Sequence, residues 1–164
     1  MAHIVQTQPP KGSLIDERAV ALGYYADAFC VDVVGEISIN QFVEAFYTTP
    51  LFKAERLILR VFAGAGTTDA QAASVAAGTS QKFAVWTQEA HTANEMLMDA
   101  GSTKSWFCTE PIEAGTRLWF GSVVMPRDPQ KGPEMGFGFR ALLGAHVFYS
   151  HLLLKAAARR LSQA

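Results

Sequence analysis

The sequence predicts an α+β fold: a curved antiparallel sheet gripping a long C-terminal helix, with two short helices after the first strand. Three observations predict it. The run "YYADAFCVDVV" near the start alternates like a strand, several further strand-like runs lie close together in the second half, and the chain ends in the apolar stretch "FRALLGAHVFYSHLLLKAAARRL". The concave face of a curved sheet needs cover, and a helix of this length supplies it.

Length and composition limit the number of domains and the kinds of partner. A chain of 164 residues suits one domain and is long enough to bury a core without disulfides or metal. With 14 basic and 15 acidic residues the formal net charge is -1, so we expect no nucleic-acid partner and no attraction to anionic membranes. The apolar share of 49%, against 18% charged residues, fits either a lined cavity or a subunit interface.

The beginning of the chain differs in character from the rest. Residues 1–22 mix prolines, glycine and scattered charge without a period, which predicts an N-terminal arm with at most one helical turn, followed by a single domain over residues 23–164. The arm lacks the pattern of a secretory signal, so we expect a cytoplasmic location. We also expect no membrane span, because His146, Ser150 and Lys155 interrupt the C-terminal apolar run.

The first strand is expected to be largely buried. Alternation places Asp27 and Phe29 on one side of it and Cys30 on the other. The two cysteines, Cys30 and Cys108, are far apart in sequence and each lies in an apolar run. We expect both to be reduced core residues.

Two helices are expected directly after the first strand. Ser38 and Gln41 have the spacing of a capping box for the first of them. Thr49 followed by Pro50 has the pattern of a cap and a first helical residue for the second. The following segment, 63–79, is built from small residues, and we expect a flexible or loosely helical connection that contributes no core.

An antiparallel meander is expected in the second half of the chain. Turn-like residues separate its four strand-like runs, which are "KFAVWTQE", "NEMLMDA", "KSWFCTEPI" and "TRLWFGSVVM". In the last run, alternation sends Trp119 to one face and Leu118 with Phe120 to the other. Aromatic side chains that point to the outer face of the sheet require a helix, a loop or a second subunit to cover them.

The terminal helix has an apolar face that includes His146, Tyr149 and Leu153. His146 and His151 are five residues apart, so a straight helix does not present them to one metal ion, and we expect no metal site. His146 is either a hydrogen-bonded core histidine or a residue lining a cavity.

Other chemical motifs are weak. The glycine-containing runs "FAGAGTT" and "GFGF" lack the flanking residues of nucleotide-binding loops, and no catalytic triad is recognisable, so we expect no cofactor. Asp27, flanked by apolar residues on a buried strand, is the carboxylate most worth testing, and Arg117 on the last strand is a candidate partner for it.

This order of elements resembles the helix-grip superfamily (START-like and polyketide-cyclase-like proteins, SRPBCC), and more narrowly a bacterial branch of it. The resemblance lies in "YYADAFCVDV", "SWFCTEPIEAGTRLWFGSVV" and "FRALLGAHVFYSHLLLKAAARR". It implies a hydrophobic cavity between the sheet and the terminal helix, which members of the superfamily use for lipids, sterols, polyketides or other apolar molecules, and in some branches for catalysis.

We therefore expect a small-molecule-binding protein for an apolar or lipid-like ligand. Two alternatives stay open: a non-catalytic homodimeric interaction module, and a cyclase- or lyase-type enzyme in which His146 or Asp27 is the general base and Tyr149 or Arg117 stabilises negative charge. The candidate ligand-binding residues are His146, Tyr149, Leu153, Trp106, Trp119, Phe120, Asp27 and Arg117.

Overall fold

The computed structural model describes residues 3–63, 66–101, 103–125 and 137–163, without the side chains of 21, 55, 58–63 and 137–146. These residues form an open seven-stranded sheet in the order β1-β2-β7-β6-β5-β4-β3, and every pairing is antiparallel. The strands are β1 (Val5–Thr7), β2 (Tyr25–Val34), β3 (Lys82–Phe83), β4 (Trp86–His91), β5 (Glu95–Asp99), β6 (Thr103–Ile112) and β7 (Gly115–Val124). The α+β fold with an antiparallel meander is confirmed.

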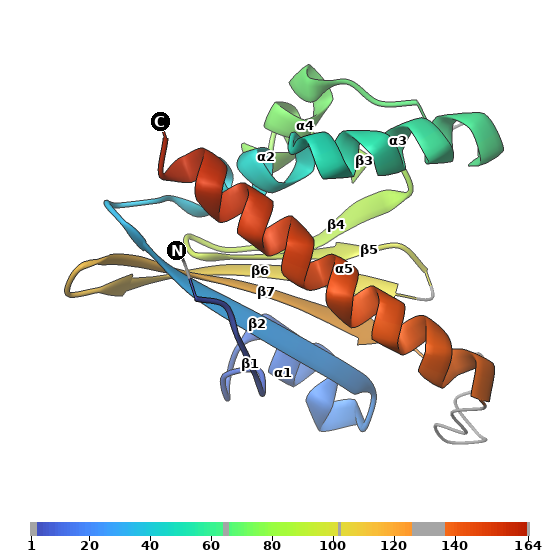
Figure 1. Ribbon diagram of the computed structural model, residues 1–164, viewed down its shortest axis with the longest axis horizontal. Coiled ribbons are helices and arrows are strands. Elements are labelled where there is room, and N and C mark those ends of the chain that lie inside the picture. The colour runs from blue at the N-terminus through green and yellow to red at the C-terminus, as the bar shows by residue number, and fades with distance from the viewer. Residues whose placement is uncertain (1–2, 64–65, 102, 126–136, 164) are drawn as a thin grey trace.

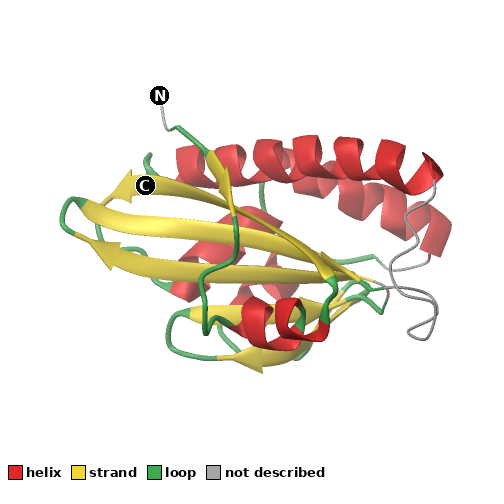
Figure 2. Ribbon diagram, turned by 90° about the horizontal axis from the view of Figure 1, so that it is seen from below, coloured by secondary structure: helices red, strands yellow, loops and turns green. Residues whose placement is uncertain are grey.

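Helices cover the two faces of the sheet unequally (Figures 1 and 2). On one side lie α2 (Ile39–Tyr47), α3 (Pro50–Ala63), α4 (Asp69–Ala76) and the long α5 (Phe137–Leu161), which crosses β2 and β7. On the other side lies α1 (Leu14–Arg18), which is followed by the short helix η1 (Val20–Leu22). We call these two sides of the sheet the helix face and the α1 face.

The predicted helix starts are confirmed by their hydrogen bonds. Ser38 Oγ accepts from the backbone N–H of Gln41, and the Gln41 side chain accepts from the backbone N–H of Ser38, which completes a capping box at the start of α2. At α3, Thr49 Oγ1 accepts a hydrogen bond from the backbone N–H of Phe52 at 3.2 Å.

Two segments are more ordered than their composition suggests. The expected N-terminal arm adds β1 to the edge of the sheet, and α1 buries Ile15 completely against the α1 face. In the expected loose connection, Thr68 caps α4 with a capping box, and α4 buries Ala72 and Val75 in the main core. Small side chains therefore let α4 pack closely against its neighbours.

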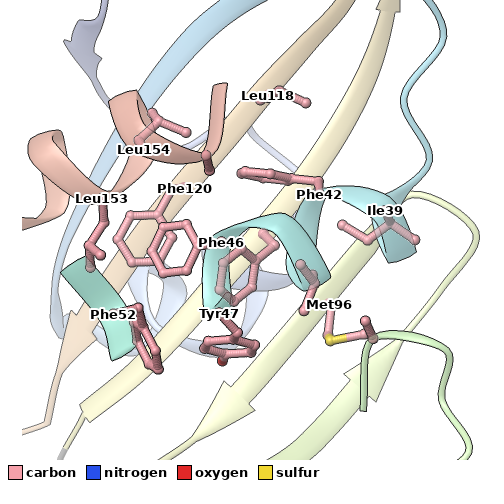
Figure 3. Packing of buried hydrophobic residues seen from close by; sticks show 14 of the residues in the cluster. Ile39, Phe42, Phe46, Tyr47, Phe52, Met96, Leu118, Phe120, Leu153 and Leu154 are labelled. Atoms are coloured by element: carbon pink, nitrogen blue, oxygen red, sulfur yellow. The ribbon is translucent and has the colours of Figure 1, made fainter. Parts of the chain in front are cut away.

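The main core lies on the helix face and is rich in aromatic rings (Figure 3). Phe46 of α2 is central: its ring centroid is 4.6 Å from that of Phe120 and 5.0 Å from that of Phe107. From α5, Leu153 and Leu154 close the same cluster. A second, smaller cluster on the α1 face packs Ile15 and neighbouring residues against Trp106 and Trp119.

Candidate functional site

The middle of the helix face is filled by aromatic side chains. Phe29, Phe120 and Phe107 pair side by side across β2, β7 and β6, and the ring of Phe46 packs on the last two. Both Phe29 and Phe107 are completely or almost completely buried. The cavity expected between the sheet and the C-terminal helix therefore does not extend under α2, where the described side chains pack directly against one another.

Two residues further along the same strands, the side chains on the helix face are mostly polar. Asp27 pairs with Ser122, Ser122 with Ser105, Ser105 with Met98, and Met98 with Gln88. Residues directly opposite one another in an antiparallel sheet share a face, so these five side chains form one line across the helix face. We call this line of Asp27, Ser122, Ser105, Met98 and Gln88 the polar row.

Asp27 is the acidic residue of the polar row and is almost completely buried. The residue is 4% exposed, and its Oδ1 accepts hydrogen bonds from Ser122 Oγ at 2.6 Å and from the Ser122 backbone N–H at 3.2 Å. Its second oxygen, Oδ2, is buried and has no hydrogen-bond partner among the described residues. Buried polar atoms are almost always paired, so an unpaired carboxylate oxygen calls for a donor from outside this set.

Gln88 lies at the other end of the polar row and repeats this feature. Its side-chain Oε1 is buried and also lacks a hydrogen-bond partner among the described residues, although its backbone N–H donates to the carbonyl of Gln81 at 2.7 Å. A carboxylate oxygen and an amide oxygen are both acceptors. The two ends of the polar row thus have the same unmet requirement, which is a hydrogen-bond donor.

Tyr25 borders the polar row on β2, two residues before Asp27 and on the same face. Burial, and in second place the negative charge of Asp27, raise the pKa of the Tyr25 phenol. The phenol therefore keeps its proton at neutral pH and does not act as a base there.

Helix α5 crosses β2 and β7 (Figure 1), and its described part contributes two of the predicted site residues. Leu153 belongs to the same core cluster as Phe120, and Tyr149 packs at the edge of that cluster. Ser150 is 1% exposed, so the buried face of α5 is centred closer to Ser150 than the helical periodicity predicts. The side chain of His146 lies outside the described residues, so its proposed role stays a prediction.

Three of the predicted site residues, Trp106, Trp119 and Arg117, lie on the α1 face of the sheet. Trp106 and Trp119 belong to the cluster on the α1 face, where they donate hydrogen bonds to Glu95 and Glu110. Trp106 is completely buried. These two tryptophans therefore do not line a cavity under α5, and they do not supply the exposed aromatic surface that the alternative of a homodimeric interaction module requires.

Arg117 also lies on the α1 face and does not meet Asp27. Its Nε donates to Asp32 Oδ1 at 2.7 Å and its Nη2 donates to Asp32 Oδ2 at 3.0 Å. Asp32 is the direct cross-strand partner of Arg117, whereas Asp27 lies five residues away on β2 and faces the other side. The predicted pairing of Arg117 with Asp27 is wrong because the register brings a nearer carboxylate to the arginine.

The cysteines do not form a reactive centre. Both thiols are free, and burial raises the pKa of Cys108 to about 12 and raises the pKa of Cys30 as well. Thiolate is the nucleophilic form, so both side chains are unreactive at neutral pH. This agrees with the predicted reduced cysteines.

A surface groove lies at the other end of the sheet, near the turn between β6 and β7. It has a volume of about 800 Å³, and its walls include Glu36, Gln41, Asn94 and Glu113. No buried side-chain atom of its described lining lacks a hydrogen-bond partner. The groove therefore has none of the unmet hydrogen bonding that distinguishes the polar row.

Ser122, Ser105 and Gln88 are site residues that sequence reasoning missed. A signal for the two serines exists: in "DAF", "SWF" and "FGS" a polar residue stands two positions from a core phenylalanine. Because β7 runs antiparallel to β2 and β6, these three polar residues reach the same end of the helix face. Gln88 has no comparable signal, since a bulge in β4 interrupts the alternation after it.

Within the described part of the chain, no three His, Cys, Asp or Glu residues come close enough to hold a metal ion. None of the described helices has the length and apolarity that crossing a membrane requires. Comparison of the chain with protein-family models, with curated proteins and with solved structures finds no match in any of the three.

Proposed function

We propose that this protein binds a small amphipathic molecule on the helix face of its sheet, with a hydrogen-bond donor of the molecule, a hydroxyl or an amine, on Asp27 Oδ2. The observation that carries the proposal is the buried Oδ2 atom without a hydrogen-bond partner among the described residues. Leaving a buried acceptor unpaired costs about 1 to 3 kcal/mol, and a donor supplied by a ligand removes this cost.

The surroundings of Asp27 favour a molecule with an apolar body. Phe29 and Phe120 are the next residues along β2 and β7 on the same face, and both are buried in the main core. A carboxylate beside a wall of aromatic rings is the usual composition of a small-molecule site, in which few polar groups orient a ligand within an apolar lining. The charge of Asp27 selects against anionic ligands, because no cationic side chain among the described residues forms an ion pair with it.

The resemblance to the helix-grip superfamily supports the same proposal. It implies a ligand between the sheet and the C-terminal helix, and α5 crosses β2, the strand that carries Asp27 (Figure 1). On this proposal Tyr149 and Leu153 contribute from α5, and His146 is retained as a candidate from its sequence position alone.

Binding of matched probes tests the proposal. Decylamine and 1-decanol carry a donor, whereas decanoate of the same chain length carries an anionic acceptor. Titration calorimetry is expected to detect binding of the first two and none of decanoate. The Asp27→Asn variant, which keeps the size of the side chain, is expected to bind decylamine at least tenfold more weakly, since hydrogen bonds to charged groups contribute about 1.5 to 3 kcal/mol.

Asp32→Asn is the matched control, because Asp32 is a carboxylate of the same strand that faces the other side and pairs with Arg117. It is expected to bind decylamine as the unaltered protein does. Equal binding of decylamine and decanoate, or equal loss in both variants, contradicts the proposal. Native mass spectrometry of the freshly purified protein, followed by solvent extraction, then identifies any molecule that is retained.

A further inference from the structure

We infer that the ligand of this site is elongated and carries a hydrogen-bond donor near each end, one for Asp27 Oδ2 and the other for Gln88 Oε1. This inference rests on the proposed function and specifies the ligand class: a linear molecule such as an amino alcohol or a diamine with an apolar chain. Two buried acceptors without a partner among the described residues, at the two ends of one cross-strand line, point to it.

The geometry of the sheet fixes the separation of the two ends. Asp27 is on β2 and Gln88 is on β4, and the strand order places β7, β6 and β5 between them. Neighbouring strands are about 4.8 Å apart, so four spacings separate the two Cα atoms by roughly 19 Å. A compact molecule with a single donor does not satisfy both acceptors.

The residues between the two ends suit a chain of methylene groups. Met98 is completely buried in the main core, and its flexible thioether side chain is able to repack against a methylene chain. The hydroxyl of Ser122 is already donated to Asp27. Over β2, β7 and β6 the polar row is flanked by Phe29, Phe120 and Phe107, which supply an apolar border on one side.

The competing explanation is that each acceptor separately binds an ordered water molecule. In that case the two ends are independent, and the length of a ligand has no optimum. A single long molecule instead couples the ends, because its second donor binds at an effective concentration set by the chain that links it to the first.

The experiment compares 1-alkylamines with ω-amino-1-alcohols over the same series of chain lengths by titration calorimetry. The affinity of the alkylamines is expected to rise smoothly with length. The amino alcohols are expected to show an optimum length at which they bind on the order of tenfold more tightly than the alkylamine of equal length.

Gln88→Met removes the acceptor and keeps the length of the side chain, and is expected to abolish the tenfold advantage of the amino alcohol over the alkylamine of equal length. Gln88→Leu is the second variant should the first fail to fold. Gln81→Met, at an exposed position just before β3, is the matched control and is expected to leave both affinities unchanged.

The outcomes separate the two proposals. Alkylamine binding that depends on Asp27, without an optimum length for the amino alcohols or with an optimum that survives Gln88→Met, overturns the inference and leaves the proposed function standing. Absence of alkylamine binding overturns the proposed function itself. An optimum that Gln88→Met abolishes supports both.

Discussion

Asp27 and Ser122 face each other across β2 and β7, and Ser122 binds Asp27 Oδ1 with both its hydroxyl and its backbone N–H, at 2.6 and 3.2 Å. The serine therefore holds Oδ1 of the carboxylate and leaves Oδ2 without a partner among the described residues. The two residues are 95 positions apart in the sequence, so the pair exists only in the folded protein.

Removing the serine hydroxyl is expected to destabilise the protein. Ser122→Ala takes one of two donors from a buried carboxylate oxygen, and the expected loss in the free energy of unfolding is about 1 to 3 kcal/mol. Urea denaturation measures it. Ser105→Ala, at the next and partly exposed position of the polar row, is the control with a smaller expected loss, and equal losses in the two variants contradict this account.

The aromatic core is expected to depend strongly on Phe46. Its ring packs on Phe120 and Phe107 in the main core, so Phe46→Ala leaves a large cavity and is expected to cost about 3 to 5 kcal/mol. Phe148 on α5 is 64% exposed, and Phe148→Ala is expected to change stability by less than about 0.5 kcal/mol. Denaturant midpoints compare the two variants, and similar losses would refute the assignment of Phe46 to the centre of the core.

Gly121 is expected to resist substitution because α1 packs directly on it. A Cβ at this position would lie 2.7 Å from the backbone oxygen of Asp27, 2.8 Å from Ile15 Cδ1 and 3.0 Å from Trp106 Cε3. Gly121→Ala is expected to destabilise by about 1 to 3 kcal/mol. Ile15→Ala removes part of the clash. The losses in the free energy of unfolding of the two single variants are therefore expected to sum to more than the loss measured for the double variant. Strict additivity in chemical denaturation would argue against contact between α1 and Gly121.

Stability is expected to fall in acid through two ion-paired carboxylates. Hydrogen bonds from Arg117 lower the pKa of Asp32, and hydrogen bonds from Lys53 and Arg56 lower that of Asp69. A pKa that is lower in the folded than in the unfolded state stabilises the protein above the ordinary value of 3.8, and this contribution is lost as the pH falls through the folded value. Both carboxylates are half exposed, so each contribution is small.

Melting temperatures of the unaltered protein and of Asp32→Asn, measured from neutral pH into strong acid, check the prediction for acid stability. The two proteins are expected to differ at neutral pH and to converge in acid, once the pH has fallen below the lowered pKa of Asp32. A difference that persists in strong acid would show that Asp32 acts through something other than its charge.

The sequence was sufficient to predict β2, the antiparallel meander and the helices α2, α3 and α5, because each has a local signal. The alternation in β7 places Trp119 and Phe120 on opposite faces of the sheet, as expected. The cap at Ser38 starts α2, also as expected. The regular structure of the N-terminal arm and of α4 was not predicted, because neither segment has bulky apolar residues at a regular spacing. Their stability comes from packing against strands and helices that are distant in the sequence.

The site was predicted only in part, because it depends on which strands pair and in which register. Asp27 and Phe120 were identified from their apolar surroundings, and they lie on one face of neighbouring strands. Trp106 and Trp119 were named as ligand-binding candidates but lie on the α1 face, since period-two alternation states which residues share a face within a strand and leaves open which face receives the long helix. The hydrogen bond between Ser122 and Asp27 requires the register itself.

The placement of β2 next to β7 has a consequence for how the chain folds. During synthesis β2 emerges early, but its long pairing partner is made only after most of the chain, as the 95-residue separation of Asp27 and Ser122 illustrates. Until then this apolar strand lacks its main neighbour, and contacts of such high sequence separation slow folding. Newly made chains are thus most prone to aggregate before β7 has been added, and the meander from β3 to β7 is the part of the sheet that is able to form first.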